Sequence, residues 1–215
     1  MPFYVLCDPP ADSADTLALT DYMPVDPVER GEPPRCPECS SCLALMLWLA
    51  PRKAQLETWA DRYGDIAFGP THELLVSDRF AQGYRKARLR GLGPLGPVEI
   101  ARVVRRAGAK PPATPPQYLY ALPVLSAAKL DADASGMETE NPYSCDACRS
   151  AVIVRYASVV LEHGSWGGED IFFARGLPGV VLTSERFADW FHADGINSGM
   201  LVPALEYAED LSPKR

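Results

Sequence analysis

The hydrophobic residues of this chain occur in short runs that are separated by prolines, glycines and charged residues. The first run, Phe3–Leu6, is rich in aromatic and branched side chains, which predicts a β-strand. Six prolines and many acidic residues lie within residues 9–34 without sustained periodicity, so we expect a long irregular segment on the surface. The run Leu43–Leu49 resembles a buried strand or a short helix, and residues 51–63 predict a helix that ends at Gly64.

One pattern occurs twice in the chain. Asp65-Ile-Ala-Phe leads through a Gly-Pro turn to Leu74-Leu-Val-Ser-Asp-Arg-Phe80, and Asp170-Ile-Phe-Phe leads through a Leu-Pro-Gly turn to Val181-Leu-Thr-Ser-Glu-Arg-Phe187. A cysteine pair precedes each copy, and a helical stretch, a glycine and a strand-like segment follow it. This ordered series predicts one structural unit that is used twice. The expected helices are residues 81–90 and 188–194, and the expected closing strands are residues 96–100 and 200–207.

The Ser-acid-Arg-Phe step in each copy predicts a switch from strand to helix. Ser77 and Ser184 stand where an N-cap hydroxyl accepts a backbone N–H, and the acidic residue after each serine lies where the helix dipole favours negative charge. The phenylalanine that ends the step is expected to pin the helix to the sheet. Because capping accounts for these residues, the step indicates structure rather than catalysis.

The segment between the two copies changes character several times. Residues 85–110 are rich in Arg and Lys, residues 111–116 form a proline-rich linker, and Tyr118–Leu125 predicts a strand. A polar loop over residues 129–143 is expected to present the second cysteine pair. The basic stretch lacks interleaved aromatic residues and belongs to an acidic chain, so it favours a solvated face over a nucleic-acid site.

The composition is that of a soluble globular protein. The 215 residues are 47% hydrophobic and 23% charged, which is enough to bury a substantial core. The net charge of −7 disfavours a nucleic-acid partner and is compatible with a basic protein partner, or with solubility alone. We expect no membrane span, because no stretch of eighteen uninterrupted apolar residues occurs. The start of the chain lacks a basic region of the signal-peptide kind, so we expect a cytoplasmic protein.

Two cysteine pairs organise the rest of the chain. They are Cys36-Pro-Glu-Cys39 and Cys145-Asp-Ala-Cys148, and each pair can direct two thiolates at one ion. In a reducing compartment, clustered cysteines are more often metal ligands than disulfides. The pattern therefore predicts one structural Zn²⁺ held by all four sulfurs, with two separate disulfides or unrelated thiols as alternatives. Cys42 continues the spacing of the first pair, either as a third ligand from that side or as a buried thiol beside the site.

The sequence indicates no catalytic site. It contains no Gly-x-Gly-x-x-Gly, Walker or Gly-x-Ser-x-Gly motif. His72, His163 and His192 have no nucleophile beside them in the sequence, and a four-thiolate zinc site leaves no open position for a reacting water. If the chain were a hydrolase or redox enzyme, its best residues would be His163 or His192 with Cys42.

The two cysteine pairs, the short N-terminal strand and the ending Val180-Val-Leu-Thr-Ser-Glu-Arg-Phe resemble the double-CXXCG motif proteins of myxobacteria, many of which are immunity proteins against contact-delivered toxins. The resemblance covers most of the chain. It departs from the family pattern after each pair, where Ser40 and Arg149 replace the expected glycine. That glycine accommodates a positive φ in the turn. The resemblance implies a cytoplasmic, non-enzymatic protein that binds a toxin, or an adaptor for a signalling partner such as a small GTPase.

We therefore predict an α+β fold in which two similar strand–helix–strand units, with a mixed or antiparallel sheet, are tied by the zinc site. The chain would form a single domain over residues 1–215. Its first unit would span residues 36–110, its linker residues 111–144 and its second unit residues 145–210. The acidic residues before the two cysteine pairs, within residues 8–38 and 131–140, would form one negative face.

Overall fold

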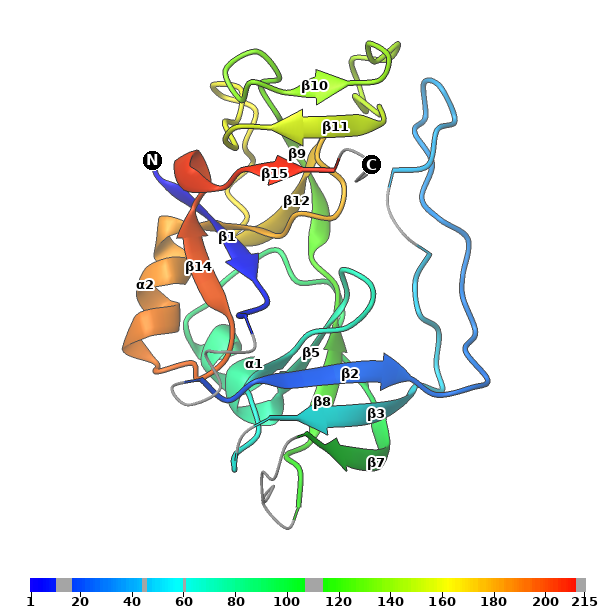
Figure 1. Ribbon diagram of the computed structural model, residues 1–215, viewed down its shortest axis with the longest axis vertical. Helices are drawn as coiled ribbons and strands as arrows, with labels where there is room; N and C mark the ends of the chain where they lie inside the picture. Colours follow the sequence, from blue (N-terminus) through cyan, green and yellow to red (C-terminus); the bar gives the residue numbers. More distant parts are fainter. Residues whose placement is uncertain (11–16, 44–45, 60, 107–113, 212–215) are drawn as a thin grey trace.

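The computed structural model describes residues 1–10, 17–43, 46–59, 61–106 and 114–211. The described chain is a mixed α+β structure made mainly of short strands, as the sequence predicted (Figure 1). Its strands form several sheets, and its two α-helices lie beside each other against them.

A five-stranded sheet contains both the N-terminal strand and the repeated pattern nearest the C-terminus. Its strand order is β14-β1-β13-β12-β9, with β9 parallel to β12 and the other neighbours antiparallel. The predicted N-terminal strand is therefore confirmed, and it lies in the middle of this sheet. The strands are β1 (Phe3–Cys7), β9 (Val124–Lys129), β12 (Ile171–Arg175), β13 (Leu182–Ser184) and β14 (Met200–Pro203).

A four-stranded sheet contains the first copy of the pattern. Its strand order is β4-β5-β8-β6, and all its neighbours are antiparallel. Strand β2 continues this sheet beyond β4, because Asp21 and Phe68 form a parallel bridge and the Tyr22 N–H donates to the Phe68 carbonyl at 2.7 Å. The four strands are β4 (Ile66–Ala67), β5 (Leu74–Ser77), β6 (Gly96–Pro97) and β8 (Tyr118–Ala121), and the added strand β2 spans Thr20–Pro24.

Two small three-stranded sheets complete the structure. The order of the first is β2-β3-β7, and the order of the second is β10-β11-β15. In Figure 1 they lie at opposite ends of the molecule. Their further elements are β3 (Lys53–Thr58), β7 (Glu99–Arg105), β10 (Glu138–Thr139), β11 (Ile153–Tyr156), β15 (Glu209–Asp210) and the short 3₁₀ helix η2 (Ala204–Glu206) that precedes β15.

Both predicted N-caps are present. The Ser77 hydroxyl accepts the Phe80 N–H at 3.1 Å at the start of α1 (Asp78–Lys86), and the Ser184 hydroxyl accepts the Phe187 N–H at 3.2 Å at the start of α2 (Glu185–Ala193). Phe80 and Phe187 are fully buried, as predicted, in one core cluster that contains side chains from both helices. The Trp190 ring packs edge-on against both of them.

The two helices also exchange polar contacts through a pair of buried aspartates. Asp65 accepts hydrogen bonds from Ser77 and Arg79, and Arg79 donates onward to the carbonyls of Asp194 and Gly195 at the end of α2. The corresponding residues of the second copy make the reciprocal contacts. Asp170 accepts from Ser184 and Arg186, and Arg186 donates to the Ala87 and Arg88 carbonyls at the end of α1.

The prediction of a helix over residues 51–63 is wrong. Residues 53–58 form β3, which pairs with β2 on one side and with β7 on the other. Ala54 and Leu56 are fully buried in this central position. Helix propensity is a weak preference that tertiary pairing overrides, and here two neighbouring strands satisfy the backbone of the segment.

Several other boundaries also differ from the predictions. Strand β2 interrupts the segment expected to be irregular over residues 9–34. Arg102 and Arg105 of the basic stretch belong to β7, an outer strand of its sheet. The predicted strand 118–125 is divided between β8 and β9, and the predicted loop 129–143 contains β10. Residues 107–113, which include the end of the basic stretch and the start of the linker, lie outside the described residues.

Candidate metal centre

The first cysteine pair lies at the tip of a long extended segment, which we call the strap. It spans residues 25–52 and is described over residues 25–43 and 46–52. Figure 1 shows the strap leaving the β2–β3 end of the molecule and reaching the level of β10 and β11 before it returns. Its two arms pair loosely, through the bridges Arg30–Trp48 and Arg35–Cys42. The strap thus carries Cys36 and Cys39 away from the sheets that contain its two ends.

The hydrophobic run of the strap does not form the buried strand or short helix that we predicted. Among the described residues of this run, Trp48 is fully buried, whereas Leu47 and Leu49 are 42% and 39% exposed. An extended two-armed segment cannot bury both its faces, because its single partner is the body of the molecule. Residues 44–45 of the run lie outside the described residues.

Glu73 fixes the base of the strap. This carboxylate is 1% exposed. Arg30 donates a hydrogen bond to each of its two oxygens, at 2.7 and 2.8 Å, and the Trp48 N–H donates a third at 3.0 Å. The hydroxyls of Thr71 and Tyr120 also donate to it, at 2.7 and 3.1 Å. A buried carboxylate with this many donors is fully compensated. Sequence reasoning missed Glu73, because no local pattern relates it to two distant arms.

The tip of the strap meets the second cysteine pair. The Cys36 and Cys145 sulfurs are 3.8 Å apart, the Cys39 and Cys148 sulfurs are 3.5 Å apart, and all four lie within 4.8 Å of one another. All six cysteines of the chain are described, and all six are free thiols. Sulfurs in a disulfide are about 2.05 Å apart, so the alternative of two disulfides does not fit this arrangement. The four predicted ligands are therefore brought together in a cluster that can hold a metal ion.

The Cys36–Cys145 and Cys39–Cys148 sulfur contacts of the cluster are close to those of a tetrahedral thiolate site, and the whole cluster, within 4.8 Å, is compatible with one metal ion. Bonds of about 2.3 Å from a central ion to each sulfur place neighbouring sulfurs roughly 3.8 Å apart. The observed contacts of 3.5 and 3.8 Å are close to this value. Each pair also forms the same tight turn, in which the N–H of the residue after the pair donates to the carbonyl of the first cysteine, at 2.9 Å for Ser40 and 2.8 Å for Arg149.

Ser40 and Arg149 adopt the backbone conformation that the missing glycines would have favoured. Their φ angles are +62° and +52°. A side chain in this left-handed region costs about 1–2 kcal/mol relative to glycine. Both turns therefore adopt the same backbone conformation without a glycine, at a cost in backbone strain.

The Arg149 side chain connects the second cysteine turn to the body. It is 8% exposed and forms ion pairs with Asp146 at 2.7 Å and Glu162 at 2.6 Å. Its guanidinium also donates to the Leu130 carbonyl at 2.7 Å and lies 5.4 Å from the centre of the Tyr143 ring. Sequence reasoning treated position 149 only as a lost glycine. The sequence signal for this anchoring role was a large basic residue at a position where the turn favours glycine.

The thiols of the cluster differ in acidity. Hydrogen bonding with the Ser41 hydroxyl, and then with the Ser41 backbone, lowers the pKa of Cys39 to about 6, whereas burial raises the pKa of Cys148 to about 12. A bound metal ion would deprotonate such thiols outright. Beside them, Lys129 and then Arg149 lower the pKa of Asp146 to about 2.

The remaining candidate residues do not form a site together. Cys42 is exposed and lies outside the cluster of four. His163 and His192 are exposed, and within the described chain no hydrogen bond joins either of them to Cys42. His72 lines the same cavity as Cys42 and packs edge-on against Phe173, and burial lowers its pKa.

Comparison with models of protein families and with curated proteins finds no match to this chain. Among the described residues, no helix combines the length and the apolar character needed to cross a membrane.

Proposed function

We propose that the four cysteines bind one structural Zn²⁺ and that the chain acts by binding a protein partner, as an immunity protein that neutralises a toxin. The observation that carries the proposal is the cluster itself. Four thiolates fill the coordination shell of zinc, so the ion would stabilise structure and activate no water. The resemblance to the double-CXXCG proteins supports the choice of a toxin as the partner, and a cytoplasmic location is part of the same proposal.

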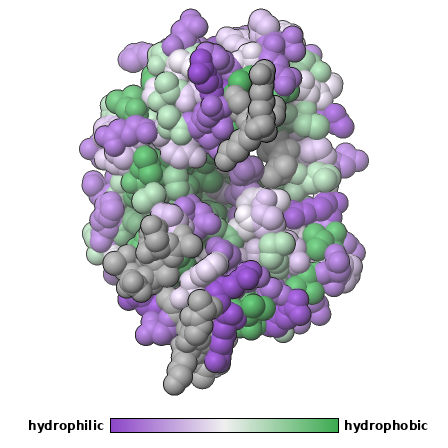
Figure 2. Space-filling model, viewed as in Figure 1, coloured by the Kyte–Doolittle hydropathy of each residue, from purple (hydrophilic) through white to green (hydrophobic). Residues whose placement is uncertain are grey.

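The surface around the cysteine cluster supports a basic partner. Glu38 lies 3.8 Å from the Cys145 sulfur, so an acidic residue of the strap meets the second cysteine turn. Glu38 and Glu140 are exposed and form no ion pair among the described residues, whereas Asp146 and Glu138 pair with neighbouring cations. Hydrophilic residues cover most of the face shown in Figure 2, with hydrophobic residues in smaller patches between them.

We also propose that the chain is a duplication whose two units exchange their first strands. Two observations support this proposal. The sheet of the first copy has the strand order β4-β5-β8-β6, and β12-β13-β1-β14 occupy the corresponding positions in the sheet of the second copy. One parallel strand extends the corresponding edge of each sheet: β2 lies beside β4, and β9 lies beside β12. Strand β8 occupies, in the sheet of the first copy, the position that β1 occupies in the sheet of the second copy. The units would then span residues 1–106 and 118–211, wider than the sequence predicted, and each would supply one cysteine pair.

The partner is tested with the product of a neighbouring gene that ends in a toxin-like domain. Cells that express this domain should survive when the present chain is co-expressed, and the two purified proteins should form a stoichiometric complex. Survival without complex formation, or a complex without survival, would argue for an adaptor or for another partner. Failure of both experiments would remove the immunity proposal.

The electrostatic part of the proposal is tested separately. Association should slow as the ionic strength rises from low to physiological values, and Glu38→Gln with Glu140→Gln should reduce this dependence. An association rate that does not change with salt would remove this mechanism even if the complex forms.

A further inference from the structure

A large cavity lies between the strap and the body of the molecule. Its volume is about 870 Å³, which is within the range of small-molecule sites. Its base lies near Glu73, where the strap is fixed, and its far end adjoins a smaller cavity that is lined by Cys148 and by several of the same residues. The strap therefore covers the cavity between two points of attachment, Glu73 and the cysteine cluster.

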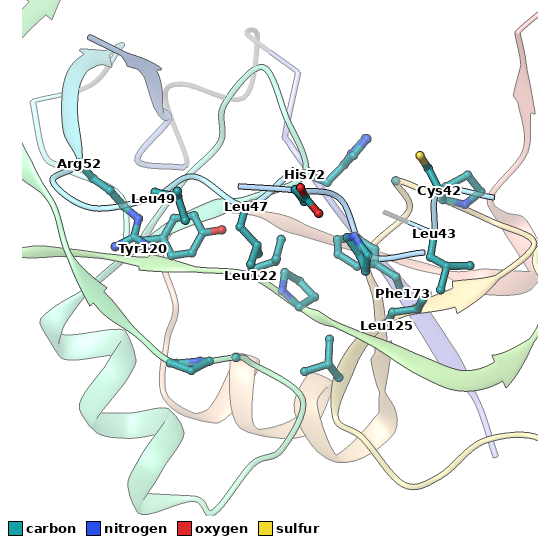
Figure 3. Close-up of a pocket in the computed structure, with 18 residues that line it drawn as sticks. Cys42, Leu43, Leu47, Leu49, Arg52, His72, Tyr120, Leu122, Leu125 and Phe173 are labelled. Atoms are coloured by element: carbon teal, nitrogen blue, oxygen red, sulfur yellow. The ribbon is translucent and has the colours of Figure 1, made fainter. Parts of the chain in front are cut away.

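The lining is apolar on both sides. Leu43, Leu47 and Leu49 approach from the strap, and Leu122, Leu125 and Phe173 approach from the body (Figure 3). Protein interiors are close-packed, and a space of this size between apolar walls forfeits contacts that an apolar occupant would supply. The exposure of Leu47 and Leu49 also indicates a site for an apolar occupant, because both side chains line this space.

The guanidinium of Arg52 lies at one end of the cavity. The Arg52 Nε–H donates to the Trp48 carbonyl at 2.7 Å, and the guanidinium lies 4.1 Å from the centre of the Tyr120 ring. These two contacts hold the group in place, while its terminal nitrogens have no hydrogen-bond acceptor among the described residues. An arginine that is held in this way is suited to receive a carboxylate or another oxyanion. Glu32, the acidic residue of the described lining, is exposed on the strap.

The shape and the backbone of the lining favour a small molecule over a protein segment. A strap that is attached at both ends admits a small molecule beneath it, whereas a folded partner would have to displace it. The walls include Pro34, Pro94, Pro123 and Pro178, which lack the N–H groups that an added peptide strand would pair with.

We propose that this cavity binds a small amphiphile that has an apolar body and one anionic group, with the anionic group on Arg52 and the apolar body between three strap residues, Leu43, Leu47 and Leu49, and the wall formed by Leu122 and Leu125. The proposal does not depend on the immunity function. It assigns to the strap a second role, as the cover of a ligand site.

The test compares octanoate with octan-1-ol, which share a chain and differ in charge, by calorimetric titration of the metal-loaded protein. Octanoate should bind with one molecule per chain. Leu47→Trp fills the cavity from an exposed position and should weaken octanoate binding at least tenfold. Met46→Trp is the matched control, because Met46 is a neighbouring strap residue, 48% exposed, that does not line the cavity; binding should stay within twofold.

Arg52→Gln tests the anion site. It should weaken octanoate binding at least tenfold and octan-1-ol binding less than twofold. The proposal would be overturned if octanoate does not bind to the native chain, if Leu47→Trp binds as tightly as Met46→Trp, or if Arg52→Gln weakens both ligands equally.

Discussion

Replacing each of the two residues that follow the cysteine pairs by glycine should have opposite effects on stability. Both positions have positive φ, so glycine relieves the same backbone strain in each turn. The side chains differ. The Ser40 side chain is exposed and makes no hydrogen bond among the described residues, whereas Arg149 is 8% exposed and holds two carboxylates and a carbonyl.

The magnitudes follow from these contacts. At Ser40, about 1–2 kcal/mol of relieved strain is offset by up to about 1 kcal/mol of added freedom in the unfolded chain, which leaves Ser40→Gly about 0.5 kcal/mol more stable. At Arg149 the same relief is outweighed by the loss of the packing of a buried guanidinium, its ion pairs with two solvent-accessible carboxylates and its hydrogen bond to the Leu130 carbonyl, so Arg149→Gly should be about 2–3 kcal/mol less stable. For a chain of this length these changes correspond to a melting temperature about 1–2 °C higher and about 5–10 °C lower, respectively.

Thermal unfolding of both variants, with metal content measured on the same samples, checks this prediction. Both variants keep all four cysteines and should keep their metal. If Arg149→Gly proved as stable as Ser40→Gly, the Arg149 contacts would contribute nothing, and our explanation for an arginine in this turn would be wrong.

Three further predictions test the attachments within the fold. Arg79→Ala and Arg186→Ala should each lower the free energy of unfolding by about 2–3 kcal/mol, because each leaves a buried aspartate without its cation. Urea titration measures this change. Arg85→Ala, at an exposed position, is the control, and its free energy of unfolding should stay within about 0.5 kcal/mol of the native value. Glu73→Ala should cost about 3 kcal/mol and speed amide hydrogen exchange in the strap, and unchanged strap exchange would contradict its anchoring role. A protease site inserted within residues 107–113 should, once cut, leave two pieces that still co-elute, because β1 and β8 each pair with strands of the other piece; separation without denaturant would refute the strand exchange.

The sequence predicted the features that depend on local chemistry. Ser77 and Ser184 cap helices because a hydroxyl at that position satisfies a free N–H whatever surrounds it, and the cysteine spacing alone indicated the cluster. The order of elements around Asp65 and Asp170 was also visible, because the same residues recur in the same order.

The features that the sequence did not reveal depend on distant partners. Residues 53–58 form a strand because β2 and β7 flank them, and neither neighbour can be inferred from the segment itself. Glu73 serves two arms of the strap that are far from it in the chain. The run around Leu47 was expected to be buried because it is apolar, but Leu43, Leu47 and Leu49 line a cavity between the strap and the body.

The central claim is that one zinc ion joins the strap to the body through four thiolates. Elemental analysis of the untagged protein, purified without added metal, tests it most directly. The account predicts one zinc per chain in the native protein, and at most a small fraction of that in Cys39→Ser and Cys145→Ser, which remove one ligand from each pair, whereas Cys42→Ser should keep its zinc. A native protein without zinc, or a Cys145→Ser variant that retains it in full, would contradict the account.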